Sequence, residues 1–205
     1  MPTRARDNPF RTERLRQVRY RLVGLTWPEL LARCETLRYR VALVGPHGSG
    51  KTTLLEDLAP HLHQRGFRTR LIRLTEDCPK LDRGSAQRVF TTLSPSDILL
   101  FDGAEQLNPL AWLWFRWRTR TAGGLIITTH RPGRLPTLLQ CSTSADLLAE
   151  IAAELLASPP ETLRPQAATL FAKHHGNLRN ALRDWYDLVA EEEADGRALS
   201  RRDMR

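Results

Sequence analysis

Residues 41–53 read VALVGPHGSGKTT, an apolar run followed by a glycine-rich turn and by residues that suit a helix. The turn contains the pattern G-x-x-x-x-G-K-[ST] in full, from Gly45 to Thr52. Glycines let the backbone bend where a Cβ would clash, so that successive N–H groups can surround phosphate oxygens. The following helix adds unpaired N–H groups and the positive end of its dipole. The stretch therefore predicts a phosphate-binding loop between a buried strand and a helix.

The side chains of this loop have predicted roles at a nucleotide. We expect Lys51 to reach the β- and γ-phosphates of ATP, Thr52 to bind Mg²⁺ through its hydroxyl, and Thr53 to contact the α-phosphate. ATP and Mg²⁺ are accordingly the predicted ligands. The expected nucleotide-binding residues of the loop are Gly45, Pro46, His47, Gly48, Ser49, Gly50, Lys51, Thr52 and Thr53.

A second apolar run, SDILLFDGAE at residues 96–105, carries a carboxylate at its end. Such a run is typical of a buried parallel strand, and ligands of open α/β sheets bind at the carboxyl edge of the strands. We therefore expect Asp102 to hold Mg²⁺, through water, opposite Thr52. The alternative is an aspartate that only caps the helix that follows.

The remaining pattern predicts an α/β fold, a P-loop domain with a mostly parallel sheet of about five strands flanked by helices, and then a small all-helical part. Pro136 places the last strand at an edge of the sheet. The predicted strands lie at about residues 40–44, 69–74, 96–102, 125–130 and 135–141. The predicted helices lie at about residues 27–37, 51–64, 79–92, 109–120, 145–157, 161–174 and 178–192.

The change of pattern near residue 144 divides the chain into two predicted domains. Residues 1–143 are expected to form the nucleotide-binding domain, of which residues 1–24 are an N-terminal extension. Residues 144–205 are expected to form a helical lid whose charged tail frays from Glu191 onward.

Composition narrows the class of protein. The chain has 205 residues, of which 41% are hydrophobic and 26% charged, as in globular domains rather than disordered ones. No apolar run reaches membrane-spanning length, and the first seven residues lack the apolar core of a signal peptide. Three scattered cysteines without metal-ligand spacing suit a reducing cytosol, so we expect a cytoplasmic protein. The net charge of +8 permits an acidic partner such as DNA or RNA.

These features together resemble the AAA+ ATPases, and within them the small bacterial ATPases of the secretion and transposition group. The resemblance covers about residues 8–192 and includes Gly176-Asn177-Leu178-Arg179 at the start of the last predicted helix. It implies the strand order 5-1-4-3-2. It also implies that Arg179 is the sensor 2 arginine, which reaches the γ-phosphate from the lid, and that Thr128, beside Thr129, occupies sensor 1. A nucleotide-dependent homo-oligomer is compatible with the resemblance.

One position departs from the family pattern. The family usually has glutamate directly after the strand-end aspartate, where it polarises the attacking water, but this sequence has Gly103. Glu105 is the nearest carboxylate, and it either takes that role or caps the helix that begins near Asn108. Arg131 and Arg134 are candidates for an arginine finger acting on a neighbouring subunit's nucleotide, or else surface residues near a turn.

The predicted function is that of an ATPase or ATP-dependent switch. We expect it to bind ATP·Mg²⁺ between the two domains and to act on a macromolecular partner, either a protein or a nucleic acid. The expected catalytic residues are Lys51, Asp102, Glu105, Thr128 and Arg179.

Three other functions stay open. A small-molecule kinase would need an acceptor site, for which residues 75–77 are the nearest candidate. An ABC-type module is suggested by residues 81–88 and His130, although Asp82 replaces the signature serine. A nucleic-acid-binding protein could use the tryptophans and arginines interleaved over residues 112–120. For that segment we favour a helix whose apolar side, with Trp112 and Phe115, covers the sheet.

Overall fold

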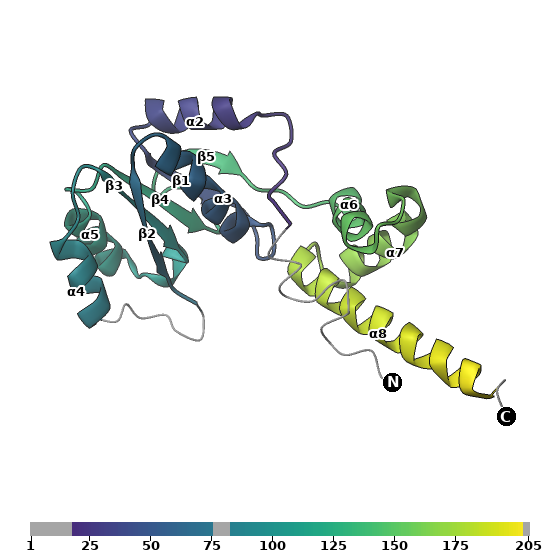
Figure 1. Ribbon diagram of the computed structural model, residues 1–205. Helices are drawn as coiled ribbons and strands as arrows, with labels where there is room; N and C mark the ends of the chain where they lie inside the picture. The colour runs from purple at the N-terminus through teal and green to yellow at the C-terminus, as the bar shows by residue number, and fades with distance from the viewer. Residues whose placement is uncertain (1–17, 76–82, 203–205) are drawn as a thin grey trace. The chain divides into compact units, whose positions relative to one another are not determined.

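A computed structural model of the protein describes residues 18–75 and 83–202 (Figure 1). The chain forms two compact units. The α/β unit contains residues 20–46 and 50–141, and the helical unit contains residues 142–202 together with residues 18–19 and 47–49.

The α/β unit contains a five-stranded sheet in which every pair of neighbouring strands is parallel. Its order is β2-β3-β4-β1-β5, so the order expected from the family resemblance is confirmed. The last strand lies at an edge, as Pro136 predicts, because proline cannot donate to a neighbouring strand. The strands are β1 (Arg40–Val44), β2 (Arg68–Arg73), β3 (Asp97–Asp102), β4 (Gly124–Thr129) and β5 (Thr137–Gln140).

The helices of this unit begin at the signals that the sequence provides. Thr26 forms a capping box with Glu29 before α2, and the Asn108 side chain accepts a hydrogen bond from the backbone N–H of Ala111, 2.8 Å away, before α5. Part of the predicted helix at 79–92 lies outside the described residues, and its described portion begins at Arg83. The helices are α2 (Trp27–Thr36), α3 (Lys51–Gln64), α4 (Arg83–Thr91), the short 3₁₀ turn η2 (Ala104–Gln106) and α5 (Pro109–Arg118).

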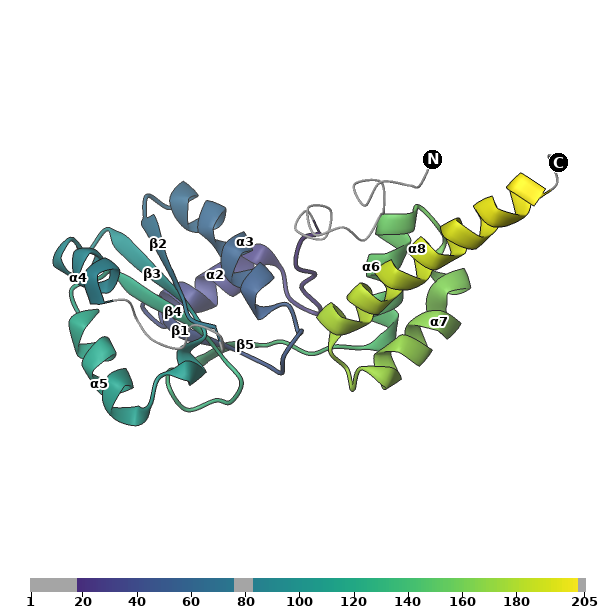
Figure 2. The ribbon, with the colours of Figure 1, turned by 90° about the horizontal axis from the view of Figure 1, so that it is seen from below.

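The sheet is buried on both faces, which explains why its central strands read as unbroken apolar runs. Successive residues of a strand point to opposite faces. Val41 and Leu43 of β1 therefore pack in the core that includes α2 and α3, while Ala42 and Val44 pack in the core that includes α5. Figures 1 and 2 show α2 and α3 on one face of the sheet and α4 and α5 on the other. Because all the strands are parallel, their carboxyl ends lie together at one edge of the sheet, where a ligand site can form.

Asp97, the first residue of β3, lies at the amino end of this strand and links it to β2. Its carboxylate is fully buried and accepts hydrogen bonds from the Ser94 hydroxyl at 2.6 Å and the Ser94 backbone N–H at 2.8 Å. Arg68 and Arg70 of β2 donate to the same carboxylate at 3.1–3.2 Å. Burial alone would raise the pKa of Asp97, but the bonds from Ser94 and the two arginines outweigh it and lower the pKa to about 2.

We predict that Asp97→Asn destabilises the protein by about 1–3 kcal/mol at neutral pH, because the buried asparagine carries no negative charge to pair with Arg68 and Arg70. Since the folded pKa of Asp97 lies below the ordinary value near 3.9, its stabilisation is complete above about pH 5 and disappears as the pH falls towards 2. Urea unfolding of both proteins between pH 7 and 2 measures this, with Asp146→Asn at an exposed ion pair as control. Equal stability losses at pH 7 and pH 2 would contradict the prediction.

The helical unit consists of α6 (Ala145–Leu156), α7 (Pro160–Lys173) and α8 (Leu178–Arg202). Its core surrounds Trp185, whose side chain is 1% exposed, with Leu148, Ala152 and Leu170 among the buried residues around it. The expected end of the last helix near residue 192 is wrong, since α8 continues to Arg202.

Two of the three cysteines, Cys34 and Cys141, are buried and are not in disulfides, and the third lies outside the described residues. Burial raises the pKa of the Cys34 thiol to about 12, so this group is an inert part of the core. In the described parts of the chain, no helix is both long enough and apolar enough to cross a lipid bilayer.

Candidate functional site

The loop between β1 and α3 has the backbone conformation that its glycines permit. Gly48 and Gly50 adopt φ values of 74° and 78°, in the left-handed region, and Gly50 is the N-cap of α3. A Cβ at Gly50 would lie only 3.1 Å from the ring of Tyr20, so space as well as backbone conformation favours glycine there. The backbone N–H of Gly45 donates to the carbonyl of Thr129 at 3.2 Å, which ties the loop to the end of β4.

Lys51 lies at the first position of α3 and points back over the loop. Its Nζ donates to the carbonyl oxygens of Gly45 at 2.7 Å and Pro46 at 2.6 Å. The side chain is 8% exposed. The ammonium charge is therefore held at the loop, on a flexible stem that can turn from these carbonyls to a phosphate.

Asp102 is held at the carboxyl edge of the sheet by hydroxyl groups from two other elements. Thr52 of α3 donates from Oγ1 to Asp102 Oδ2 at 3.0 Å, and Thr128 of β4 donates to Asp102 Oδ1 at 2.6 Å. Thr128 in turn accepts a hydrogen bond from the backbone N–H of Gly103 at 2.8 Å. The carboxylate thus has a fixed orientation beside Thr52, the other residue predicted to bind Mg²⁺. Hydroxyl and carboxylate oxygens are ligands that suit this hard cation.

The sequence analysis did not identify Arg73, which contacts this carboxylate, or Glu56, which contacts Arg73. Arg73, the last residue of β2, donates from Nε to Asp102 Oδ2 at 3.0 Å and from Nη2 to Glu56 Oε1 at 2.7 Å. Burial lowers the pKa of Arg73, but its bonds to Glu56 and Asp102 outweigh this and raise it overall. The register of the sheet could have identified Arg73, because this residue pairs with Asp102 across β2 and β3. The spacing of α3 could have identified Glu56, because it lies one helical turn after Thr52.

Gly103 stands where the family usually has glutamate, and its geometry explains the departure. Its φ is 89°, and a Cβ there would overlap the backbone carbonyl of Leu74. Glu105 instead follows in η2, with Oε1 lying 3.3 Å from His130 Nε2. Its Oε2 is buried and has no hydrogen-bond partner among the described residues. Glu105 is therefore a carboxylate with an unused acceptor near the end of β3, and not merely a cap of α5, since Asn108 fills that role.

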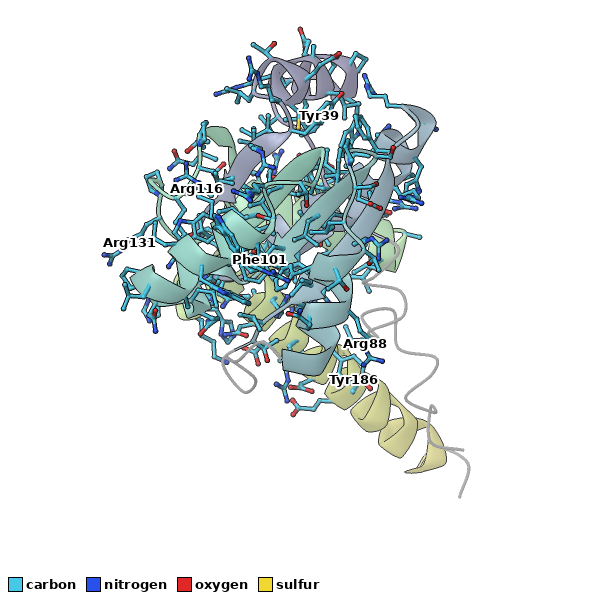
Figure 3. All side chains as sticks on the ribbon, turned by 90° about the vertical axis from the view of Figure 1, so that its left-hand side faces the viewer. Tyr39, Arg88, Phe101, Arg116, Arg131 and Tyr186 are labelled. Carbon is cyan, nitrogen blue, oxygen red and sulfur yellow. The ribbon has the colours of Figure 1, made fainter. Side chains whose placement is uncertain are left out.

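The two arginines considered as arginine fingers differ in their surroundings. Arg134 donates from Nη2 to the carbonyl of Leu107 at 2.5 Å, and its guanidinium lies 5.1 Å from the ring centroid of Trp112. Burial lowers the pKa of Arg134, partly offset by the charge of Glu105. Arg134 is thus engaged within the α/β unit. Arg131 is exposed, and Figure 3 shows its side chain at the periphery of this unit.

Arg179 lies in the first turn of α8, in the helical unit, and its side chain is exposed. Gly176 before it has a φ of 82°, and the Asn177 side chain accepts from the backbone N–H of Asn180 at 3.2 Å. The glycine break and the asparagine cap of the Gly-Asn-Leu-Arg pattern are therefore both present.

The alternative functions, a small-molecule kinase and an ABC-type module, depend in part on residues that the structure does not describe. This applies to residues 76–77 of the suggested kinase acceptor and to residues 81–82 of the segment similar to the ABC signature, whose remainder begins α4. His130, suggested as a switch histidine, lies beside Glu105. Within residues 18–75 and 83–202, no cluster of three or more histidine, cysteine or acidic side chains could hold a metal ion.

Comparison with solved structures shows a likeness to RuvB of Thermotoga maritima. The structure named as a Holliday junction branch migration motor is 22% identical, with a TM-score of 0.51 over 76% of this chain and 58% of that chain. Two variants of the same protein are 22% and 19% identical, each with a TM-score of 0.50, over 76% and 78% of this chain and 58% and 60% of theirs. This chain thus spans less than two thirds of the RuvB chains, and at these identities the likeness shows the fold alone.

Comparison with curated proteins gave no match. The model of the family described as "ATPase family associated with various cellular activities (AAA)" matches residues 41–151. That range is more than half of the chain, and it contains the glycine-rich loop, Asp102 and Thr128. The protein, a P-loop ATPase by fold and by this match, belongs to the AAA family.

Proposed function

We propose that this protein binds ATP·Mg²⁺ at the loop of residues 45–52 and hydrolyses the nucleotide to act on a macromolecular partner. The observation that carries the proposal is the 3.0 Å hydrogen bond from Thr52 Oγ1 to Asp102 Oδ2. It brings the hydroxyl that follows the loop lysine next to the carboxylate that ends β3. These are the two oxygen groups with which P-loop proteins bind Mg²⁺.

The other residues have distinct roles in this proposal. Lys51 leaves the loop carbonyls and pairs with the β- and γ-phosphates, while the loop N–H groups surround the phosphate oxygens. Thr52 and Asp102 hold Mg²⁺, which when bound neutralises charge on the β- and γ-phosphate oxygens. Thr128 acts by orienting Asp102, and Thr53 contacts the α-phosphate.

Glu105 is the proposed residue that orients the attacking water. Its buried Oε2 has no partner among the described residues and can accept a hydrogen bond from water. Because Gly103 has no room for a side chain, no carboxylate can occupy the family's usual position without a backbone shift. A displaced base is expected to give slow hydrolysis.

The partner is proposed from charge and from likeness of fold. The chain carries a net charge of +8, which favours an acidic partner. RuvB, with the same fold, is named as a motor for Holliday junctions, so branched DNA is one candidate and an acidic protein is another. A homo-oligomer that forms when ATP is bound belongs to the same proposal.

Phosphate release tests the proposed activity. The purified full chain is given ATP with Mg²⁺ or with EDTA, in the absence and presence of duplex and four-way DNA, and its mass in solution is measured with a non-hydrolysable ATP analogue. We expect free phosphate only with Mg²⁺. Absence of ATP binding would overturn the proposal, and transfer of phosphate to a metabolite without free phosphate would replace it with the kinase.

We predict that Arg179→Ala weakens ATP binding by about tenfold or more and leaves ADP binding nearly unchanged. A guanidinium pairs well with the γ-phosphate, which ADP lacks, and a hydrogen bond to a charged group contributes about 1.5–3 kcal/mol. Titration of both nucleotides into wild type and variant measures the effect. Arg183→Ala, one helical turn further along α8 and also exposed, is the matched control. Equal losses for ATP and ADP would show that Arg179 is no sensor.

A further inference from the structure

Helix α5 has two apolar faces, and among the residues that the structure describes only one of these faces is buried in the α/β unit. Trp112 and Phe115 are buried against the sheet, as the sequence analysis expects. The opposite side exposes an apolar stripe that we call the outer α5 face. It consists of Leu110, Leu113, Trp114 and Trp117, which are 79%, 59%, 48% and 53% exposed. Their spacing, i, i+3, i+4 and i+7, is that of a helix face that packs against another element.

The surroundings of the outer α5 face are positively charged. Residues 106–121 contain Arg116, Arg118 and Arg120 and no aspartate or glutamate. Arg40 adds a fourth cation, because its guanidinium donates to the carbonyls of Thr119 and Ala122 just beyond the helix, at 3.0 Å each. Burial first, and then the charge of Arg116, lowers the pKa of Arg40. The face therefore favours a partner that brings negative charge to its rim. Figure 3 shows Arg116 at the periphery of the unit and Phe101 in its interior.

The arrangement of the aromatic rings disfavours nucleic acid as that partner. The guanidinium groups of Arg120 and Arg118 lie 4.9 Å and 5.9 Å from the ring centroid of Trp117, so this ring is already engaged by cations. Trp114 meets Phe90 edge to face at 5.5 Å. Proteins that bind single-stranded nucleic acid stack the bases on free faces of aromatic rings. Two of the four residues of the outer α5 face are leucines, which have no ring.

A second copy of this chain is disfavoured as well. Each copy carries a net charge of +8, and the rim of the outer α5 face is itself basic, so pairing two such faces would place like charges together. Exposed tryptophans beside arginines are instead the residue types that dominate the binding energy of protein–protein interfaces.

We propose that the outer α5 face binds an amphipathic helix of a partner protein, whose apolar stripe is flanked by aspartate and glutamate. Leu110, Leu113, Trp114 and Trp117 bury the apolar stripe, and Arg116 and Arg120 pair with the flanking carboxylates. None of these residues is among those proposed to bind or hydrolyse the nucleotide, so the proposal does not rest on ATP hydrolysis.

Binding of synthetic peptides to the full chain tests the proposal. The probe is a fluorescent helical peptide of about 18 residues, with a leucine stripe at i, i+3, i+4 and i+7 and glutamate at the flanking positions. One comparison peptide has lysine in place of glutamate, and another has the composition of the probe in scrambled order. We expect the acidic amphipathic peptide to bind at least about tenfold more tightly than both, by anisotropy.

Variants assign the binding to this surface. Leu113→Glu is expected to weaken binding of the acidic peptide at least about tenfold, and Arg116→Glu with Arg120→Glu should reverse the preference towards the lysine peptide. Val23→Glu changes an apolar residue that is 85% exposed elsewhere on the α/β unit and serves as the matched control. Thermal melting and ATP binding of each variant verify that it is folded.

Three outcomes would overturn the proposal. The first is equal binding of the scrambled peptide, or binding that Leu113→Glu leaves unchanged. The second is binding of single-stranded DNA that competes with the peptide and is lost in Leu113→Glu, which would assign the surface to nucleic acid. The third is a concentration-dependent dimer that Leu113→Glu dissociates, measured by sedimentation, which would assign it to a second copy.

Discussion

Replacing Lys51 by alanine is expected to weaken ATP binding by at least about a hundredfold while the fold persists. The ammonium is proposed to pair with both the β- and the γ-phosphate, and each hydrogen bond to a charged group contributes about 1.5–3 kcal/mol. Two such bonds amount to about 3–6 kcal/mol, and each 1.4 kcal/mol is a factor of about ten in affinity. Isothermal titration of ATP into wild type and variant measures the loss.

The structure indicates why the variant remains folded. Lys51 donates to the carbonyls of Gly45 and Pro46, and Pro46 is exposed, so water can replace the ammonium there. Lys173→Ala, which removes a lysine paired with Asp184 at 2.6 Å in the helical unit, is the control for loss of one positive charge. A Lys51→Ala protein that binds ATP·Mg²⁺ as tightly as wild type would remove the central claim about the loop.

The parts of the fold that the sequence predicts are those governed by local signals. The limits of α3 follow from Gly50 before it and Gly66 after it, and β3 follows from an apolar run long enough for a strand buried on both faces. The pairing of strands is not local, and its order came from the family resemblance. For the same reason the contact between Asp102 and Thr128 could be expected only once β3 and β4 were known to be neighbours.

The residues that the sequence analysis missed lack a local signal. Arg73 reads as the last polar residue of an alternating strand, and only its register opposite Asp102 gives it a place in the site. The sequence analysis considered Trp114 and Trp117 among the aromatic residues of 112–120, but it did not predict that they form an exposed apolar face. A helix of ten residues can turn only one face to the sheet, and that face carries Trp112 and Phe115. Whether the other face is covered depends on a partner, which the sequence of this chain does not contain.

The second large effect is expected at Asp102, which forms an ion pair with Arg73. Asp102→Asn is expected to raise the Mg²⁺ concentration needed for half-maximal phosphate release by about 10–100-fold, the usual effect of losing a group that holds a metal through water. An asparagine has one acceptor oxygen, while Thr52 and Thr128 both donate to this position, and it has no charge for a cation. ATP binding measured in EDTA should change little, because the loop and Lys51 are intact.

A second variant separates this interpretation from simple destabilisation. Arg73 donates to Asp102 Oδ2, the oxygen that also accepts from Thr52, so it competes with Mg²⁺ for the same negative charge. Arg73→Gln is therefore expected to lower the Mg²⁺ concentration needed, opposite to Asp102→Asn, whereas Asp146→Asn at an exposed ion pair should leave it unchanged. General loss of stability would shift the Mg²⁺ concentration needed by Asp102→Asn and by Arg73→Gln in the same direction. Opposite shifts would therefore place the metal at Asp102, while equal shifts, or none, would show that the Thr52–Asp102 contact is structural only.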